Sequence, residues 1–291
     1  MKTSIIVLAG VLAGLVVSGC GGIVKKPEIN SVKRIGIISV YSNSRLHYFH
    51  ENKVIISPTP MDFAASALKL GAAVKNSFDK SSPLLEFARQ SLEAEFKKLP
   101  QFQVIPFEEF GQNPAYRNLS VSTGKPMFQN KTLTIGSMIS TPPDFDIAPG
   151  MKAIEGLAQS PVDRTLMTNL TNLAKDLNLD GVIVVRFELG YKNAFFTFHS
   201  LGSALAGSVS GGRTVSAVAS VAATLRLITR QGNFGIVIPD FKDGEGSRKV
   251  SDKKFTIMDG KALMTDETVA AMRESILQAV VSMREMIAKE L

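Results

Sequence analysis

The chain has 291 residues, of which 45% are hydrophobic, and a formal net charge of +7. This length and composition suit one large or two small domains with a sizeable core. The only cysteine is Cys20, so an intramolecular disulfide is excluded and stability must come from packing. The cations are scattered along the chain, and nucleic acid is not an expected partner.

The first 22 residues, MKTSIIVLAGVLAGLVVSGCGG, have the three-part pattern of a secretory signal. A single charge, Lys2, precedes an uncharged run from Ile5 to Val17, and small residues follow. A membrane-spanning helix would need about 20 apolar residues, and this run is shorter. The pattern therefore predicts a cleaved signal peptide over residues 1–19.

The end of this segment, Val17-Ser18-Gly19-Cys20, resembles the lipobox of bacterial lipoproteins. The resemblance implies that Cys20 is lipidated and becomes the first residue of the mature chain. In diderm bacteria an aspartate after the cysteine commonly retains a lipoprotein at the inner membrane, and here Gly21 follows. The resemblance therefore implies a lipid anchor in the outer membrane, with the protein facing the periplasm. The alternative is an ordinary secreted protein with a chance cysteine.

Residues 20–32 predict a lipidated tether, because they contain two glycines and a proline and show no hydrophobic periodicity. A flexible chain of this length averages about 20 Å, so the folded part must sit close to its membrane. Four cations flank the tether, and they either contact an anionic leaflet or are merely solvated: Lys25, Lys26, Lys33 and Arg34. The β-branched run from Arg34 to Tyr41 then predicts a central, buried strand.

Residues 42–60 contain two histidines, His47 and His50, whose spacing could place two zinc ligands on one face of a helix. The prolines that follow favour a loop instead, with a second short strand at 54–57. The third histidine, His199, is far away in the sequence. We therefore expect no metal site.

Two helices are expected next. Apolar residues recur at steps of three and four from Met61 to Lys80. Ser82-Pro83 predicts the start of the second helix, which ends before Pro100. Its apolar stripe is Leu85, Ala88, Leu92, Phe96 and Leu99. Residues 102–107 then predict a strand whose proline, Pro106, requires an edge or an end.

Residues 111–150 predict an irregular excursion, because they contain five prolines and show little periodicity beyond a possible strand at 132–138. Loops of this length inside a domain are usually functional or disordered. The excursion is therefore either a surface for partners or a passive insertion.

A third helix is predicted to start at Ser160-Pro161, with Asp163 in its first turn and an apolar stripe from Val162 to Leu177. Residues 182–191 predict another buried strand. From Arg213 to Arg230 apolar and other residues alternate, which predicts a long strand.

The C-terminal part is predicted to contain a turn at 231–233, a last strand at 234–238 and a charged loop at 240–254. Thr265 is expected to cap the final helix. Its apolar positions keep the helical period for over six turns and predict packing across the sheet: Val269, Met272, Ile276, Val280, Met283, Ile287 and Leu291.

These elements together predict an α/β fold with a mixed sheet flanked by helices, in a single domain over residues 33–291. The element order, the pattern Ala-Lys-x-Leu-x-x-Asp-Gly-Val at 174–182 and the turn-linked strands of 213–233 resemble the CsgG / TolB amino-terminal / LpoB group of periplasmic domains. The resemblance implies a structural, assembly or adaptor protein without enzyme activity or cofactor, which binds other envelope proteins or itself. The long excursion and the short tether depart from that group.

Motifs for catalysis are incomplete. Residues 207–214 fit the spacing of a phosphate loop except that Arg213 replaces lysine, but the residues that follow alternate as a strand, whereas a phosphate loop precedes a helix. Three scattered histidines leave no base paired with a nucleophile. Four acids are interpreted as solvated charges: Glu93, Glu95, Glu108 and Glu109. The alternative to a non-enzyme is a periplasmic hydrolase whose site the sequence does not reveal.

Residues 193–212, NAFFTFHSLGSALAGSVSGG, contain no charged side chain. Four glycines and four serines make them a poor spanning helix. Three interpretations remain: a disordered loop, a self-association arm, or a membrane-inserting β-hairpin like the one with which the CsgG group builds an oligomeric secretion pore. About 9 to 11 residues per strand suffice to cross a bilayer. The contact residues would be Phe195, Phe196, Phe198, Leu201 and Leu205.

Overall fold

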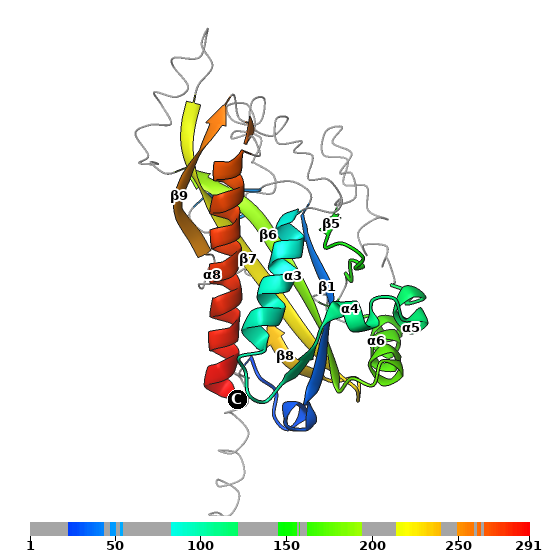
Figure 1. Cartoon of the computed structure of the whole chain (residues 1–291). Helices are drawn as coiled ribbons and strands as arrows, with labels where there is room; N and C mark the ends of the chain where they lie inside the picture. Colours follow the sequence, from blue (N-terminus) through cyan, green and yellow to red (C-terminus); the bar gives the residue numbers. More distant parts are fainter. Residues whose placement is uncertain are drawn as a thin grey trace, which may run out of the picture.

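The computed structural model describes residues 23–43, 47–50, 53–54, 83–121, 145–155, 157, 162–193, 214–239, 249–258, 261–262 and 265–291. In these ranges the strands form a mixed sheet flanked by helices, which confirms the predicted α/β class (Figure 1). None of the helices in these ranges is long and apolar enough to cross a membrane.

The sheet follows the order β10-β9-β7-β6-β1-β4, while β2, β5 and β8 pair beside this path. The strands are β1 (Arg34–Asn43), β2 (His47–His50), β3 (Lys53–Val54), β4 (Gln103–Ile105), β5 (Phe145–Ile147), β6 (Gly181–Asn193), β7 (Thr214–Thr229), β8 (Phe234–Ile238), β9 (Lys249–Met258) and β10 (Lys261–Ala262). The helices are η1 (Glu28–Ser31), α3 (Pro83–Phe96), α4 (Phe107–Phe110), α5 (Pro114–Arg117), α6 (Arg164–Asp176) and α8 (Asp266–Glu290).

The predicted central strand is confirmed, because β1 lies inside the sheet and pairs parallel with both β4 and β6. The strand predicted at 102–107 is shorter and forms the edge strand β4. Pro106 follows it as the N-cap of α4, with extended backbone angles. A proline at this position removes no ladder hydrogen bond, as expected for the end of an edge strand.

One face of the sheet is covered by α3 and α8, which lie side by side in Figure 1. The alternation predicted for β7 is confirmed on this face, where Ala217, Ala219, Val221, Ala223, Leu225 and Leu227 are buried. The small residues allow α8 to approach closely, and the Ser275 hydroxyl donates a hydrogen bond to the Ala219 carbonyl at 3.2 Å. The final helix therefore packs on the sheet as predicted.

The N-cap and stripe of α8 are also confirmed. The Thr265 hydroxyl accepts a hydrogen bond from the Thr268 backbone N–H at 3.3 Å. The middle of the stripe is buried: Met272, Ile276, Val280, Met283 and Ile287. Full burial of each such side chain stabilises the fold by about 1.5 to 3 kcal/mol.

The opposite face of the sheet is covered by α4, by the loop before β6 and by residues after β5. A Cβ added to Gly36 on β1 would lie 2.8 Å from Leu179 Cδ1 and 3.1 Å from Phe110 Cε1. Glycine at this position thus lets the covering layer touch the backbone of β1. The third helix packs against β6 and β7, but it begins at Arg164 with Asp163 as its N-cap, later than the predicted start.

Parts of the expected excursion at 111–150 are regular. Near its start, α5 forms, and the buried Tyr116 hydroxyl donates a hydrogen bond to the Ile38 carbonyl at 2.8 Å. Near its end, β5 pairs antiparallel with β1. Both elements are stabilised by contacts with β1, which is distant in the sequence. The spacing of apolar residues within the segment gives no indication of such contacts. The possible strand at 132–138 and the helix predicted at 61–80 lie outside the described residues.

The prediction for the chain after β8 is wrong. The loop expected at 240–254 ends in β9, which begins at Lys249 and pairs antiparallel with β7, so β8 is not the last strand. Pairing with β7 outweighs the low strand propensity of the Lys- and Asp-containing run. The second short strand, expected at 54–57, overlaps β3 at Val54, and residues 55–57 lie outside the described residues; β2 precedes β3 at 47–50.

Residues 23–32 are part of the fold and are not the expected flexible tether. Val24 forms a β-bridge with Ile236 on β8, and Ile29 and Val32 are each 0% exposed. This segment has no periodicity because it combines a bridge with the short helix η1, so its apolar residues reach the core at irregular intervals.

We predict that Ile29→Ala lowers the free energy of unfolding by about 2 kcal/mol or more, because it leaves a cavity in the core. Urea unfolding measures this change. The matched control is Asn30→Ala at an exposed neighbour, which should alter stability by less than about 0.5 kcal/mol. Equal and negligible effects of both substitutions would mean that the segment is a tether after all.

Candidate functional site

One end of the sheet gathers five segments of the chain, and we call it the base: residues 23–34, 97–103, 175–181, 229–235 and 287–291. Hydrogen bonds join these segments. The Gln101 side chain donates to the Ile29 carbonyl at 3.0 Å, and the Arg230 N–H donates to the Asp180 carbonyl at 2.7 Å. Figure 1 shows the N-terminal segment (blue) and the C-terminus at this same end of the molecule.

The chain joins the base at Ile23, where α8 holds it. The Glu290 carboxylate accepts hydrogen bonds from the backbone N–H groups of Ile23 at 3.2 Å and Val24 at 2.9 Å. On the other side, the Lys25 N–H donates to the Gly235 carbonyl at 2.8 Å. The backbone is therefore fixed from Ile23 onward. Three residues extend at most about 10 Å, so Cys20, itself outside the described residues, is held within that distance of the base.

A second carboxylate, Asp180, organises the start of β1. Its Oδ2 accepts hydrogen bonds from the backbone N–H groups of Lys33 at 3.0 Å and Arg34 at 2.8 Å. The Asp180 N–H donates in turn to the Arg34 carbonyl at 2.8 Å. Asn178, two residues earlier, has a φ of 51°, which turns the chain from α6 into β6. The aspartate of the Ala-Lys-x-Leu-x-x-Asp-Gly-Val pattern thus has a structural role, joining β1 to the turn before β6.

The uncharged segment is attached at the opposite end of the sheet. β6 and β7 pair without interruption from Gly181↔Thr229 at the base to Asn193↔Ala217. At about 3.3 Å per residue, these pairs separate the two ends by about 40 Å. The residues proposed for membrane or self-association contact, Phe195, Phe196, Phe198, Leu201 and Leu205, lie outside the described residues. Their attachment points, however, are fixed far from the base.

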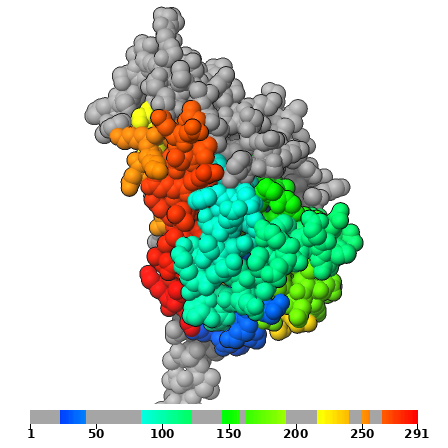
Figure 2. All heavy atoms as spheres, viewed as in Figure 1, coloured from blue at the N-terminus to red at the C-terminus, as the bar shows by residue number. Residues whose placement is uncertain are grey.

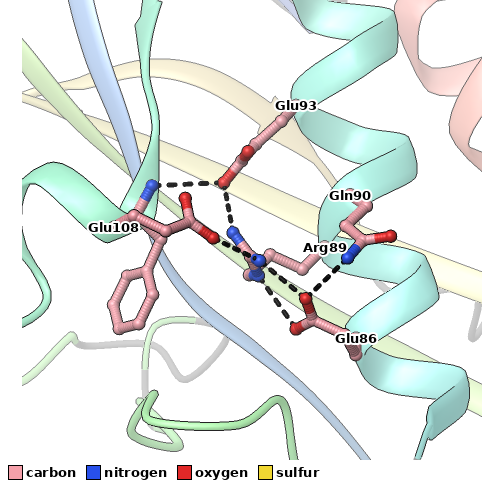
Figure 3. Close-up of polar contacts among 6 residues, drawn as sticks. Glu86, Arg89, Gln90, Glu93 and Glu108 are labelled. Atoms are coloured by element: carbon pink, nitrogen blue, oxygen red, sulfur yellow. Dashed lines mark hydrogen bonds and ion pairs between the residues drawn. The ribbon is translucent and has the colours of Figure 1, made fainter.

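The acids interpreted as solvated charges are not all solvated, which corrects that interpretation. Glu93 is 8% exposed and Glu95 is 7% exposed. Figure 3 shows that Glu93 belongs to a cluster around Arg89 of α3. The guanidinium donates to Glu93 at 2.8 Å, to Glu86 at 2.7 and 3.0 Å, and to Glu108 at 2.7 Å. Sequence reasoning missed the cluster because Glu108 is brought to Arg89 by the packing of α4.

The Arg89 cluster is suited to cross-linking and not to proton transfer. The hydrogen bond from Arg89 lowers the pKa of Glu86. The pKa of Glu108 is lowered by a backbone hydrogen bond and by Arg89. These carboxylates are therefore ionised near neutral pH, whereas a general acid needs a raised pKa. Glu93 also accepts a hydrogen bond from the Phe107 N–H at 3.3 Å, so the cluster joins α3 to α4.

A second polar group lies on the face of the sheet away from α8. The Arg186 guanidinium of β6 lies 3.4 Å from the Glu188 carboxylate and 5.9 Å from the centre of the Phe145 ring. Burial raises the pKa of Glu155, and the charge of Arg186 opposes that shift. Two carboxyl groups beside an arginine do not by themselves assemble a nucleophile with a base, so this group does not define a reaction.

The remaining sequence candidates are placed as follows. His47 and His50 lie on strand β2, so the helical face that would bring two ligands together does not form. The part of the chain that the structure describes holds no group of three or more His, Cys, Asp or Glu residues that could bind a metal ion. The residues after the loop at 207–214 form β7, as predicted, in place of the helix that a phosphate loop requires.

No family model matches this chain, and no curated protein matches it. The site must therefore be interpreted from its own geometry.

We predict that Arg89→Met lowers the free energy of unfolding by about 3 kcal/mol at neutral pH, because Glu93 keeps a buried charge without its partner. The pKa of Glu86 and of Glu108 is lowered from the ordinary value of 4.5, so these ion pairs stabilise the fold above pH 4.5. That contribution disappears as the pH falls further. Urea unfolding at several pH values should therefore show a smaller difference from wild type in acid.

The control for this prediction is Lys98→Met, which removes a 60% exposed partner of Glu95 and should cost less than about 1 kcal/mol. A loss at Arg89 that is no larger than the loss at Lys98, or that does not change with pH, would contradict the assignment of the cluster as an ionic cross-link.

Proposed function

We propose that this chain is an outer-membrane lipoprotein, anchored through lipid on Cys20 and facing the periplasm, with a structural, assembly or adaptor role among envelope proteins. The observation that supports the proposal is the hydrogen bonding of the backbone at Ile23. Glu290 holds the backbone at Ile23, only three residues after the cysteine. An anchor so close to the body suits a protein that holds partners at the membrane surface.

The dimensions of the sheet support the same function. With the base at the bilayer, the far end of β6 and β7 extends about 40 Å into the periplasm. The described edges and helices then present a rigid body of fixed height. The mixed sheet with its flanking helices is compatible with the fold of the CsgG / TolB amino-terminal / LpoB group, whose members assemble or support envelope structures.

We expect Cys20→Ser to remove the lipid and to shift the protein out of the outer-membrane fraction. Joined to an ordinary cleaved secretory signal in place of residues 1–19, the same substitution should give soluble periplasmic protein. Cell fractionation and the intact mass of the purified protein measure both outcomes. Gly22→Ser is the control and should stay lipidated. Wild-type protein that is soluble and lacks the mass of a lipid would refute the anchor.

Self-association through the uncharged segment is a second candidate. It is favoured by the pairing of β6 with β7, which continues as far as Asn193 and Ala217. Strand β7 itself begins three residues before Ala217, at Thr214. The segment between them therefore closes a long hairpin. A secretion pore would require this far end to enter the bilayer while Cys20 holds the base about 40 Å away. The body would then have to lie along the membrane, so contact between copies fits the anchored base better.

Deletion of Leu201 to Gly212 tests this candidate. If the segment is a self-association arm, the detergent-extracted wild type should be larger than a monomer and the deletion variant should be a monomer. Light scattering after size exclusion measures both masses. A pore predicts in addition that conductance in lipid bilayers is lost. An unchanged monomer before and after the deletion would exclude both.

A further inference from the structure

The base is rich in basic side chains. Its five segments contain nine basic side chains and four acidic ones, compared with 33 and 26 in the whole chain. None of the nine is buried. They are Lys25, Lys26, Lys33, Arg34, Lys97, Lys98, Lys175, Arg230 and Lys289. Figure 2 shows the N-terminal segment (blue), the end of α8 (red) and α3 (cyan) meeting at this surface.

Two of the four acids at the base are turned inward to the backbone. Asp180 accepts hydrogen bonds from the N–H groups of Lys33 and Arg34, and Glu290 accepts from those of Ile23 and Val24. Their charge is therefore used to hold the fold at the base. The other two, Glu28 and Asp176, lie at this surface with the nine cations, of which Lys98 is paired with Glu95 and Arg34 donates to the Asn178 carbonyl.

We propose that the base binds the anionic headgroups of phospholipids in the bilayer that holds the anchor. The proposal adds a lipid surface as the partner of the base, and its location rests on the proposed function of Cys20. Each lysine or arginine near an anionic bilayer strengthens binding about fivefold. Nine basic side chains over five segments are therefore sufficient to hold the base against an anionic membrane surface.

The type of cation favours a lipid surface over a fixed partner. Seven of the nine are lysines, whose ammonium groups are mobile point charges on flexible stems and do not require one geometry. Such groups suit a fluid array of phosphates, whereas a single bound phosphate or carboxylate is usually held by the planar fork of arginine. The proposed lipidation site is only three residues before Ile23, so a lipid on Cys20 would bring the headgroups to the same surface.

The test uses the exported Cys20→Ser protein, so that binding by the base is measured without the anchor. Co-sedimentation compares vesicles of phosphatidylcholine with vesicles in which part of it is replaced by phosphatidylglycerol. We expect binding only to the second kind, and weakening by added salt, because screening acts on exposed charges. A triple variant of Lys33→Gln, Lys175→Gln and Lys289→Gln should weaken this binding more than about tenfold.

The matched control removes three lysines from β9, which pairs with the far half of β7: Lys249→Gln, Lys253→Gln and Lys254→Gln. It has the same net charge as the base variant and should change binding less than about twofold. Urea unfolding verifies that both variants are folded. Equal loss in both would mean that net charge acts and not the base, and would overturn the proposal.

Two further outcomes decide the nature of the ligand. Equal binding to neutral vesicles, or binding of inorganic polyphosphate in preference to anionic vesicles at matched phosphate concentration, would overturn a lipid partner. Because the assay omits the lipid on Cys20, its result is independent of whether the wild type is lipidated. The intact mass of the wild-type protein tests the anchor separately.

Discussion

Thirteen consecutive residue pairs join β6 to β7, and the rest of the fold is placed by reference to this ladder. It fixes which residues of both strands face α8 and which face α6. It also sets the length of the body, because its first pair lies at the base and its last lies about 40 Å away. β1 joins one side of the ladder and β9 the other. The base, which we propose to bind lipid, and the attachment points of the uncharged segment are therefore held at opposite ends of this ladder.

The base depends on carboxylates that serve the backbone. Asp180 and Glu290 each accept two backbone N–H groups, one pair at the start of β1 and one pair at Ile23 and Val24. Hydrogen bonds to an ionised acceptor are about twice as strong as those between neutral groups. Two acids thus fix the N-terminal segment without any periodic structure in it. This arrangement holds the backbone at Ile23, three residues after the proposed site of lipidation.

Charge is distributed by layer and not by sequence. The acids of α3 and α4 surround Arg89 on the side of the body, where they hold two helices together. Nine of the basic side chains lie at the base, and none of these is buried. A weakly basic chain can in this way present a strongly basic surface at one end, and its overall net charge says little about the partner that each surface fits.

Local patterns in the sequence were sufficient for the elements that bury one continuous stripe or alternate regularly. α3, α8, β6 and β7 follow from spacing alone, because a helix or a strand buried on one side must repeat its apolar residues at its own period. The resemblance of residues 17–20 to a lipobox is equally local. These features determine the α/β class and the proposed anchor, and they require no knowledge of which elements become neighbours.

Only the tertiary structure decided the rest. Residues 23–32 lack periodicity and fold because β8 and Glu290 supply partners from more than 200 positions away. β9 forms from a lysine-rich run because β7 offers it an edge. Glu93 is buried because Arg89 neutralises it, and Glu108 reaches the same guanidinium only through the packing of α4. The positive charge of the base likewise depends on long-range contacts. A single segment supplies at most four of its nine cations, and only the folded sheet brings the five segments together.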